Sequence, residues 1–376
     1  MRHQLRYWLA VAAMVGSLGL ISGCAGDPPD PRIKFTERVN ERLATAYQPT
    51  HNETAGWDAT WQLDQQAVGV TWLAPATHAR LPLIIYLPGL GESSSGGMVW
   101  RKAWAQAGYA VLSVQGHAYD QSIFSSRQAL DGDFRGLASS DYSAAALRDR
   151  LSTLQAVLTE VRTRAAKGDA QLAAIDWNQV VVAGFDVGAQ TAEALAGALE
   201  PDVVSGVVIE PEALLLLSPY VEAGARRETF ARISVPVLSV TGEADEDPFN
   251  WVSSYRQRQM LGESVKEAGS IQLELDNATH KTLSGTDLLH RPMKKADKGD
   301  DASGSASKGK GHKHGAKSAG GFHGPTGEPA PDPKQVAAIQ AIAVAFLDSR
   351  IKHDSAATQW LQKDAPGWLG AAGRFK

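Results

Sequence analysis

The sequence predicts an α/β fold with a mostly parallel central sheet and helices on both faces. Three observations favour this class. Short apolar runs that suit buried strands alternate with helical patterns between residues 83 and 275. Such alternation is typical of parallel sheets whose strands are connected by helices. Hydrophobic residues make up 43% of the 376-residue chain, which is enough for a large core.

The first 23 residues have the composition of an export signal. Arg2 and Arg6 supply the positive start, and the apolar run 8–21 is shorter than a membrane span of about 20 residues. The run ends in the sequence ISGC, at Cys24, and this ending resembles the lipobox of bacterial lipoproteins. The resemblance implies that Cys24 is acylated and becomes the new N-terminus. The alternative is an ordinary signal peptide with an incidental cysteine.

The residues around Cys24 also predict a location. Cys24 is the only cysteine in the chain, so no internal disulfide forms. Ala25 follows it, whereas in lipoproteins generally an Asp directly after the cysteine retains the protein at the inner membrane. We therefore expect attachment to the membrane through the lipid anchor, at the periplasmic face of the outer membrane if the host has one. Residues 24–32 (CAGDPPDPR) form a Pro-rich tether.

The elements of the body follow in order after the tether. Val68, Val70 and Trp72 alternate with small or polar residues, as expected of a strand with one buried face. A long helix is indicated where Leu147 to Val161 repeat apolar residues every three or four positions. The complete set is strands at 57–63, 67–73, 83–87, 109–114, 180–183, 203–209, 235–240 and 271–275, and helices at 99–107, 147–161, 191–199 and 336–346; residues 214–217 are taken as a short apolar patch.

Residues 291–333 interrupt this pattern. They contain almost no large apolar side chain, so we expect a disordered insertion within a single domain made of residues 33–290 and 334–376. Seven Lys and three Asp give residues 294–317 a charge of +4, and the signal adds +2. Since the whole chain carries −4, the rest of the body carries −10. An acidic body of this kind argues against nucleic-acid binding.

The segment that predicts chemistry is VVVAGFDVGAQTA, residues 180–192. An apolar strand runs into the sequence GFDVG, and a helix follows. This matches the G-x-S-x-G nucleophile elbow, with Asp186 in place of Ser. The elbow residue occupies a tight, strained turn, and flanking glycines remove side chains that would collide there. The helix N-terminus behind it favours negative charge. Asp186 is therefore the candidate nucleophile.

A candidate acid and a candidate base follow Asp186 in the chain. Asp245 comes just after the strand at 235–240, in the pattern G-x-x-D-x-x-P. His280 is the histidine that follows the last predicted strand, 271–275, after both other candidates, whereas His117 opens the loop after an earlier strand and stays open as a pocket residue. The order Asp186, Asp245, His280 is the nucleophile–acid–base order of one large class of hydrolases. Other acidic residues remain alternatives for the acid: Glu210, Glu243, Glu246 and Asp247.

An oxyanion hole is predicted from two backbone N–H groups. Val187 follows the nucleophile, and Leu90 lies in the sequence LPGLGE directly after the strand at 83–87. Two convergent N–H groups of this kind stabilise developing oxyanion charge by about 3 kcal/mol per donor. The alternative is that Gly89 and Gly91 merely form a turn.

These motifs together resemble the α/β-hydrolases, in the branch of dienelactone hydrolases and platelet-activating-factor acetylhydrolases. The resemblance covers residues 65–290 and 334–363, and it implies the α/β-hydrolase fold with Asp186, Asp245 and His280 as catalytic residues. The segments that carry it are LPGLG (87–91), AGFDVGAQTA (183–192), NATH (277–280) and AFLD (345–348). The fold itself serves many chemistries, so the substrate stays open beyond a small molecule.

Asp186 departs from this branch, whose members use Ser or Cys, and three interpretations remain. In the first, Asp186 is a carboxylate nucleophile and His280 activates the water that hydrolyses the ester or anhydride intermediate. Haloalkane dehalogenases and epoxide hydrolases resemble this motif, but Val187 stands where dehalogenases have Trp, and a large cap domain is missing. In the second, the protein is a non-catalytic lipoprotein that binds a ligand or interacts with the cell envelope. In the third, Asp186 is a general base on water.

No cofactor or metal is expected. The sequence contains no phosphate-binding loop. His312 and His314 lie in the predicted disordered insertion without a fixed scaffold. The tryptophans at 57, 61, 72, 100 and 104 have strand or helix spacing, which is more typical of core than of a pocket. The oligomeric state is left open.

Overall fold

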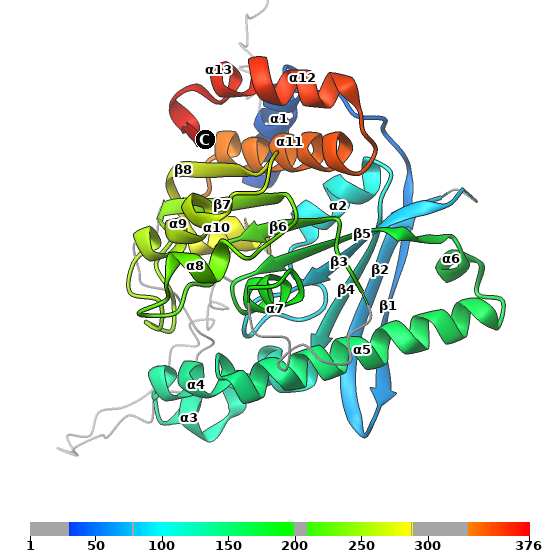
Figure 1. Ribbon diagram of the computed structural model, residues 1–376, viewed down its shortest axis with the longest axis vertical. Coiled ribbons are helices and arrows are strands. Elements are labelled where there is room, and N and C mark those ends of the chain that lie inside the picture. Colours follow the sequence, from blue (N-terminus) through cyan, green and yellow to red (C-terminus); the bar gives the residue numbers. More distant parts are fainter. Residues whose placement is uncertain (1–29, 77–78, 199–208, 287, 289–329) are drawn as a thin grey trace, which may run out of the picture.

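A nine-stranded mixed sheet organises the computed structural model, which describes residues 30–76, 79–198, 209–286, 288 and 330–376 (Figure 1). The strand order is β1-β2-β4-β3-β5-β6-β7-β8-β9. All neighbours from β4 through β8 pair in parallel, and the pairs at the two edges are antiparallel. The predicted α/β class with a mostly parallel sheet is therefore confirmed.

The strands are β1 Thr54–Leu63, β2 Gln66–Pro75, β3 Leu81–Leu87, β4 Ala110–Gly116, β5 Ile175–Phe185, β6 Ala213–Leu217, β7 Val237–Ala244, β8 Ile271–Thr279 and β9 Gly373–Phe375. The α-helices are α1 Pro31–Leu43, α2 Met98–Gln106, α3 Arg127–Leu130, α4 Phe134–Asp141, α5 Ala144–Ala166, α6 Ala170–Ala173, α7 Val187–Leu195, α8 Arg227–Phe230, α9 Tyr255–Ser264, α10 His280–Ser284, α11 Pro333–Arg350, α12 Ser355–Lys363 and α13 Ala365–Leu369. Three short 3₁₀ helices complete the set: η1 His117–Tyr119, η2 Gln121–Ser125 and η3 Gly370–Ala372.

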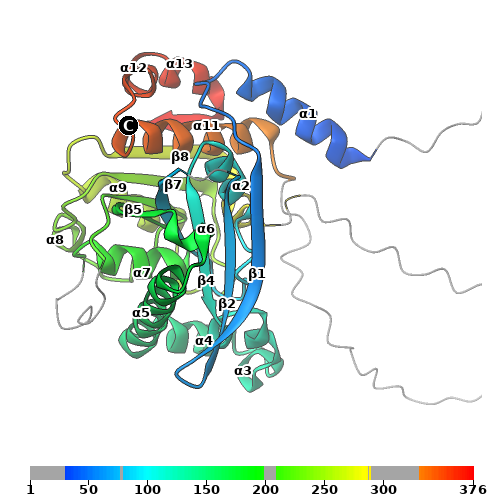
Figure 2. The same cartoon turned by 90° about the vertical axis from the view of Figure 1, so that its right-hand side faces the viewer.

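Two hydrophobic cores lie on opposite faces of the sheet. One face carries α2 and α11, with Trp100, Trp104 and Phe346 fully buried against it. The other face carries α5, α7 and α9, and the predicted apolar face of α5 lies in this core. Helix α1 packs against α11 at one end of the molecule (Figure 2). The predicted helices on both faces are thus present, and the central strands are buried on both sides.

A third, smaller apolar cluster lies beside the sheet rather than on a face. It joins Leu90 and Val187, which follow the carboxyl ends of β3 and β5, to aromatic and aliphatic side chains of three other segments. These segments are residues 117–142 between β4 and α5, the loop after β6 and the loop after β7. The buried members are Leu90, Tyr119, Ile123, Leu137, Ala138, Tyr142, Val187, Tyr220, Phe249 and Val252; we call this set the cover cluster.

The structure corrects the prediction of the sixth strand. The strand between β5 and β7 is Ala213–Leu217, which includes the run 214–217 taken as a mere apolar patch. Each of its five residues is buried, because the strand is covered on both faces, and burial here outweighs the helix preference of Leu. The predicted strand at 203–209 lies outside the described residues apart from Ile209, which is not in a strand.

Several other predictions are only partly covered by the described residues. Helix α1 begins at Pro31, capped by the side chain of Asp30, so the predicted tether ends in a helix. Helix α7 begins at Val187, four residues before the predicted start, directly after Asp186. The signal, Cys24 and nearly all of the predicted disordered insertion 291–333 lie outside the described residues. The core positions of Trp61, Trp72, Trp100 and Trp104 are confirmed.

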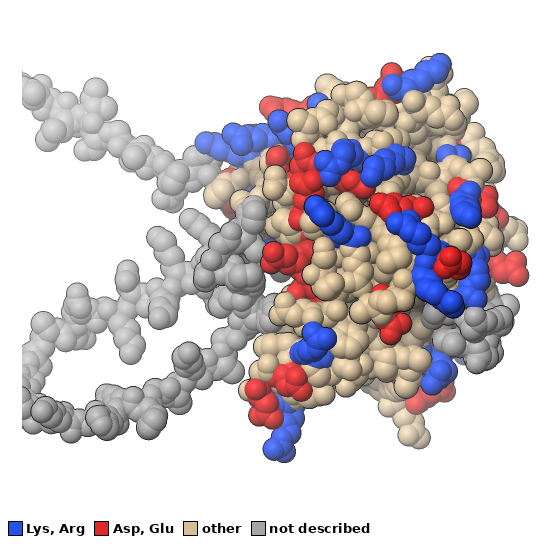
Figure 3. Space-filling model, turned by 60° about the vertical axis from the view of Figure 1, so that its left-hand side comes forward, with Lys and Arg blue, Asp and Glu red and all other residues tan. Residues whose placement is uncertain are grey.

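Acidic and basic side chains are interspersed on the face shown in Figure 3, without a broad region of one sign. Within the described ranges, no helix combines the length and the apolar character that crossing a membrane requires.

Candidate active site

Asp186 occupies a sharp turn between β5 and α7. The strand ends at Phe185 and the helix begins at Val187, so one residue makes the whole reversal. The backbone of Asp186 has φ 52° and ψ −112°, a conformation that L-residues rarely adopt and that costs about 1–3 kcal/mol. Its side chain is almost fully buried, with 1% of the residue exposed. The predicted elbow geometry is therefore present around an aspartate.

The two glycines of the elbow allow α7 to lie close to the sheet. A Cβ on Gly188 would lie 1.9 Å from the carbonyl oxygen of Leu87, at the end of β3. A Cβ on Gly184 would lie 2.4 Å from the carbonyl oxygen of Gly188. Both contacts are with backbone, which cannot give way as a flexible side chain can. The G-x-D-x-G spacing therefore reflects close packing on both sides of Asp186.

Asp245 and His280 form a hydrogen-bonded pair. Asp245 follows β7 and His280 follows β8, so both lie at the carboxyl edge of the sheet, as Asp186 does. His280 Nδ1 donates to Asp245 Oδ1 at 2.7 Å, and its Nε2 has no partner among the described residues. The Oγ of Ser218, at the end of β6, lies 3.2 Å from the same Nδ1. The structure thus brings together the predicted acid and the predicted base.

Burial and charge act in opposite directions on this pair. Burial raises the pKa of Asp245, but the Arg258 guanidinium and His280 outweigh it and hold the pKa below its ordinary value. Burial lowers the pKa of His280, but the hydrogen bond to Asp245 and the charges of Asp245 and Asp186 outweigh it and raise the pKa. The imidazole, with 12% of its side chain exposed, is the most accessible of these groups.

Arg258 was not foreseen from the sequence, and it lies between the two carboxylates. Its Nη2 is 3.7 Å from Asp186 Oδ1, and its Nε is 3.5 Å from Asp245 Oδ2. Within the described part of the chain, no hydrogen bond or ion pair joins Asp186 directly to His280. Arg258 belongs to the charged sequence YRQRQ at the start of α9, which carries no signal of a buried site. Asp186 therefore faces Arg258.

Two backbone N–H groups next to Asp186 lack acceptors among the described residues. They belong to Val187 and Leu90, the residues predicted to form the oxyanion hole. The loop that carries Leu90 lies against the elbow, since a Cβ on Gly89 would be 3.5 Å from that of Asp186. Gln115 on β4 holds this loop by donating to the carbonyls of Gly89 and Glu92, each at 3.0 Å.

Glu92 links the loop of Leu90 to the segment after His280. Its Oε2 accepts from the N–H of Gly89 at 3.0 Å, and its Oε1 accepts from the Thr286 hydroxyl at 2.7 Å. Thr286 Oγ1 in turn accepts from the N–H of Gly97 at 2.8 Å. Burial raises the pKa of Glu92. This carboxyl group therefore fixes the position of the loop.

Aromatic side chains of the cover cluster lie over the elbow. The rings of Tyr142 and Tyr220 stack with centroids 4.7 Å apart, and Trp251 donates from its indole to the Tyr220 hydroxyl at 3.2 Å. Burial, followed by the charge of Asp186, raises the pKa of Tyr142 well above its ordinary value. These residues come from segments that were predicted only as loops or not at all.

The alternative acids lie elsewhere or have other roles. Glu243 pairs with Arg374 at 2.7 Å. Asp247 accepts from three backbone N–H groups of its own loop, at Phe249, Trp251 and Val252. Glu210 and Glu246 are exposed. His117, a further histidine after a strand, is 65% exposed and pairs with Asp120.

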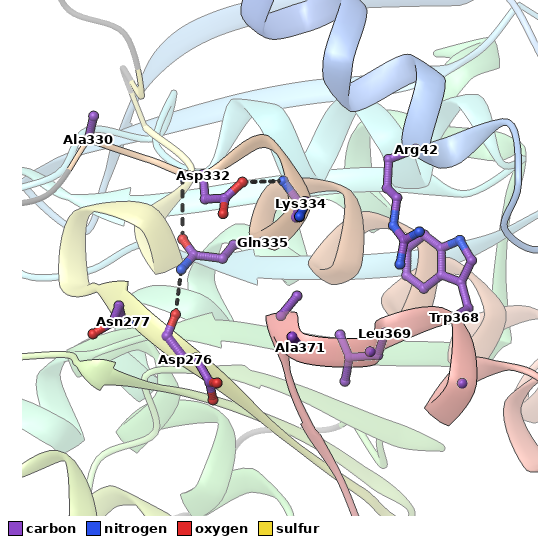
Figure 4. A pocket seen from close by; sticks show the side chains of 13 residues that line it. Arg42, Asp276, Asn277, Ala330, Asp332, Lys334, Gln335, Trp368, Leu369 and Ala371 are labelled. Carbon is purple, nitrogen blue, oxygen red and sulfur yellow. Dashed lines mark hydrogen bonds between the residues drawn. The ribbon is translucent and has the colours of Figure 1, made fainter.

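Two open pockets lie away from Asp186 and His280. A groove of about 1120 Å³ runs between α1, α2 and α11. A polar pocket of about 660 Å³ lies at the start of α11, where Gln335 bridges Asp332 and Asp276 and Arg42 stacks on Trp368 (Figure 4). In the described part of the chain, no three His, Cys, Asp or Glu side chains are grouped in a way that could hold a metal ion.

Comparison with known proteins does not assign the chain to a family. No protein-family model matches the chain, and no curated protein matches it either.

Proposed function

We propose that the protein is an exported, lipid-anchored hydrolase with the α/β-hydrolase fold that cleaves esters or related carbon electrophiles through Asp186. The observation that carries the proposal is the strained turn of Asp186, next to which lies the hydrogen-bonded pair of Asp245 and His280. Strained polar residues at the ends of strands are typical of catalytic sites. The position of the Leu90 loop after β3 and the order of the three residues also support this fold.

The chemistry follows from the groups at the turn. A carboxylate oxygen of Asp186 forms a bond to an electrophilic carbon of the substrate, and the leaving group departs with the electron pair. His280 Nε2 then takes a proton from water, whose oxygen attacks the carbonyl carbon of the resulting ester or anhydride. The N–H groups of Leu90 and Val187 stabilise the oxyanion that forms there. Collapse restores the Asp186 carboxylate, releases the product, and returns the proton from His280.

A second candidate function is ligand binding without catalysis. It is favoured by the almost complete burial of Asp186 and by the ion pair with Arg258 in place of a contact with His280. Under this proposal Asp186 completes a buried polar network, and the retained Asp245–His280 pair is structural.

A panel of activated esters, lactones and epoxides separates the two functions. The wild type should hydrolyse at least one substrate class, and Asp186→Asn and His280→Gln should each abolish that turnover while leaving the melting temperature measurable. Asp186→Ser adds a third arm. It should lose the native activity if Asp186 is the nucleophile, and it should gain activity on small esters if the site is that of a ligand-binding relative. Turnover that survives Asp186→Asn would overturn the proposal.

A further inference from the structure

The guanidinium of Arg258, next to the proposed catalytic residues, is completely buried. Its Nη1 donates to the carbonyl oxygens of Ser218 and Pro219, at 3.0 and 3.2 Å. These two bonds fix the plane of the guanidinium at the end of β6. The remaining nitrogens, Nε and Nη2, then point toward Asp245 and Asp186. A buried cation without compensating anions would cost several kcal/mol, so its charge requires both carboxylates.

The contacts with the two carboxylates are electrostatic rather than hydrogen-bonded. At 3.5 and 3.7 Å, neither pair meets hydrogen-bond geometry, and the four atoms involved have no other hydrogen-bond partner among the described residues. They are Arg258 Nε and Nη2, Asp186 Oδ1 and Asp245 Oδ2. Structural ion pairs are usually closer and better satisfied. The side chain of Arg258 therefore acts on the two carboxylates through its positive charge rather than through hydrogen bonds.

The other titratable side chains around Arg258 and the two carboxylates are mostly acidic. Glu92 after β3 acts on Asp186 and His280, Tyr142 before α5 and Tyr220 after β6 act on Asp186, and Glu193 on α7 and Asp247 after β7 act on Arg258. Arg258 is the cation that interacts with the two carboxylates in the described region. Without it, two carboxylates and an imidazole would share one buried volume, and the imidazole, which is the most basic of the three groups, would take up a proton more readily.

We infer that Arg258 is a positioning residue of the proposed catalytic site, whose positive charge lies between the Asp186 and Asp245 carboxylates and disfavours the imidazolium form of His280. This inference rests on the proposed function for its catalytic meaning. A carboxylate must be ionised to attack carbon, and an imidazole must be uncharged to accept a proton from water. The Arg258 guanidinium lies 3.7 Å from Asp186 Oδ1, and its charge favours the ionised form of Asp245 and disfavours the imidazolium of His280.

The test is the titration of His280 by NMR in the full chain, with the resonance assigned by its loss in His280→Gln. Arg258→Gln removes the cation, so the His280 pKa should rise by about one pH unit. Arg258→Lys keeps a charge, so its His280 pKa should stay close to that of the wild type. Asp186→Asn removes an anion, so the His280 pKa should fall. Asn also tolerates the positive φ of the turn, which keeps this variant able to fold.

The outcomes are distinct from those of the activity panel, because the titration needs no substrate. A folded Arg258→Gln variant with an unshifted His280 pKa would assign Arg258 a structural role and overturn the inference. If Arg258→Gln does not fold, Asp186→Asn decides: an unshifted His280 pKa would show that the charges beside Arg258 do not act on His280 and would also overturn the inference. Shifts in the expected directions without turnover would support the inference and count against the proposed function alone.

Discussion

Replacing Gly188 with Ala tests the packing that creates the elbow. The added methyl group would lie 1.9 Å from the carbonyl oxygen of Leu87, 2.6 Å from its carbonyl carbon and 2.7 Å from the carbonyl oxygen of Pro88. Ordinary contact begins at 3.4 Å, so the first turn of α7 and the end of β3 must separate by about 1.5 Å. Overpacking typically costs 1–3 kcal/mol, and a clash with backbone lies at about the upper end of that range.

A loss of about 3 kcal/mol lowers the melting temperature by roughly 4–5 °C, because the unfolding entropy of a chain of this size is about 0.6–0.8 kcal/mol/K. Since Leu90 and Asp186 lie on the two segments that separate, hydrolytic activity should fall more steeply than stability. Thermal unfolding and turnover of Gly188→Ala are the assays. Gly367→Ala is the matched control, because its Cβ would meet nothing within 4 Å. Equal melting temperatures and equal turnover for the two variants would refute the packing argument.

Three further predictions concern single side chains. Asp245→Asn should abolish turnover and lower the His280 pKa, which NMR measures. Because the Asp245 pKa is lowered in the folded state, the wild type should lose stability as the pH falls below about 4, and the variant should lose less stability over the same range. An unchanged acid-side stability curve in Asp245→Asn would contradict this. Glu92→Gln should lower the free energy of unfolding in urea by about 1 kcal/mol, because one hydrogen bond is lost. The exposed control Glu246→Gln should leave the free energy of unfolding unchanged, and equal urea midpoints for the two variants would count against the role of Glu92. Cys24→Ala should remove the acyl mass from the purified chain and release the protein from membranes, and membrane retention of an unacylated mature chain would show that the lipobox prediction is wrong.

The sequence predicted the parts of the site that are encoded locally. Asp186 is recognisable because glycines at fixed spacing and a strand-to-helix transition surround it. Asp245 and His280 are recognisable because each follows a strand, and parallel strands bring their carboxyl ends to one edge. The predicted oxyanion-hole residues were also predictable from local sequence, because Leu90 lies just after the strand at 83–87 and Val187 directly follows Asp186.

The parts that depend on tertiary packing were not predictable. Arg258 lies on a short polar helix whose sequence is typical of a solvated surface, and only the placement of α9 against β7 buries it. The aromatic rings over the elbow come from three separate loops, whose order in space no local pattern encodes. Strand β6 was missed because periodicity cannot decide whether a short apolar run such as 214–217 enters the sheet.

The central claim is that Asp186 forms a covalent bond with the substrate, and a single turnover in heavy-oxygen water tests it most directly. With enzyme in excess over the best substrate of the panel, water attacks the carbonyl carbon of the Asp186 ester. The account predicts one heavy oxygen in the peptide that contains Asp186, detected by mass spectrometry after proteolysis, and a first product that carries ordinary oxygen. Heavy oxygen in the product, with none in the Asp186 peptide, would contradict the account, because water would then have attacked the substrate directly.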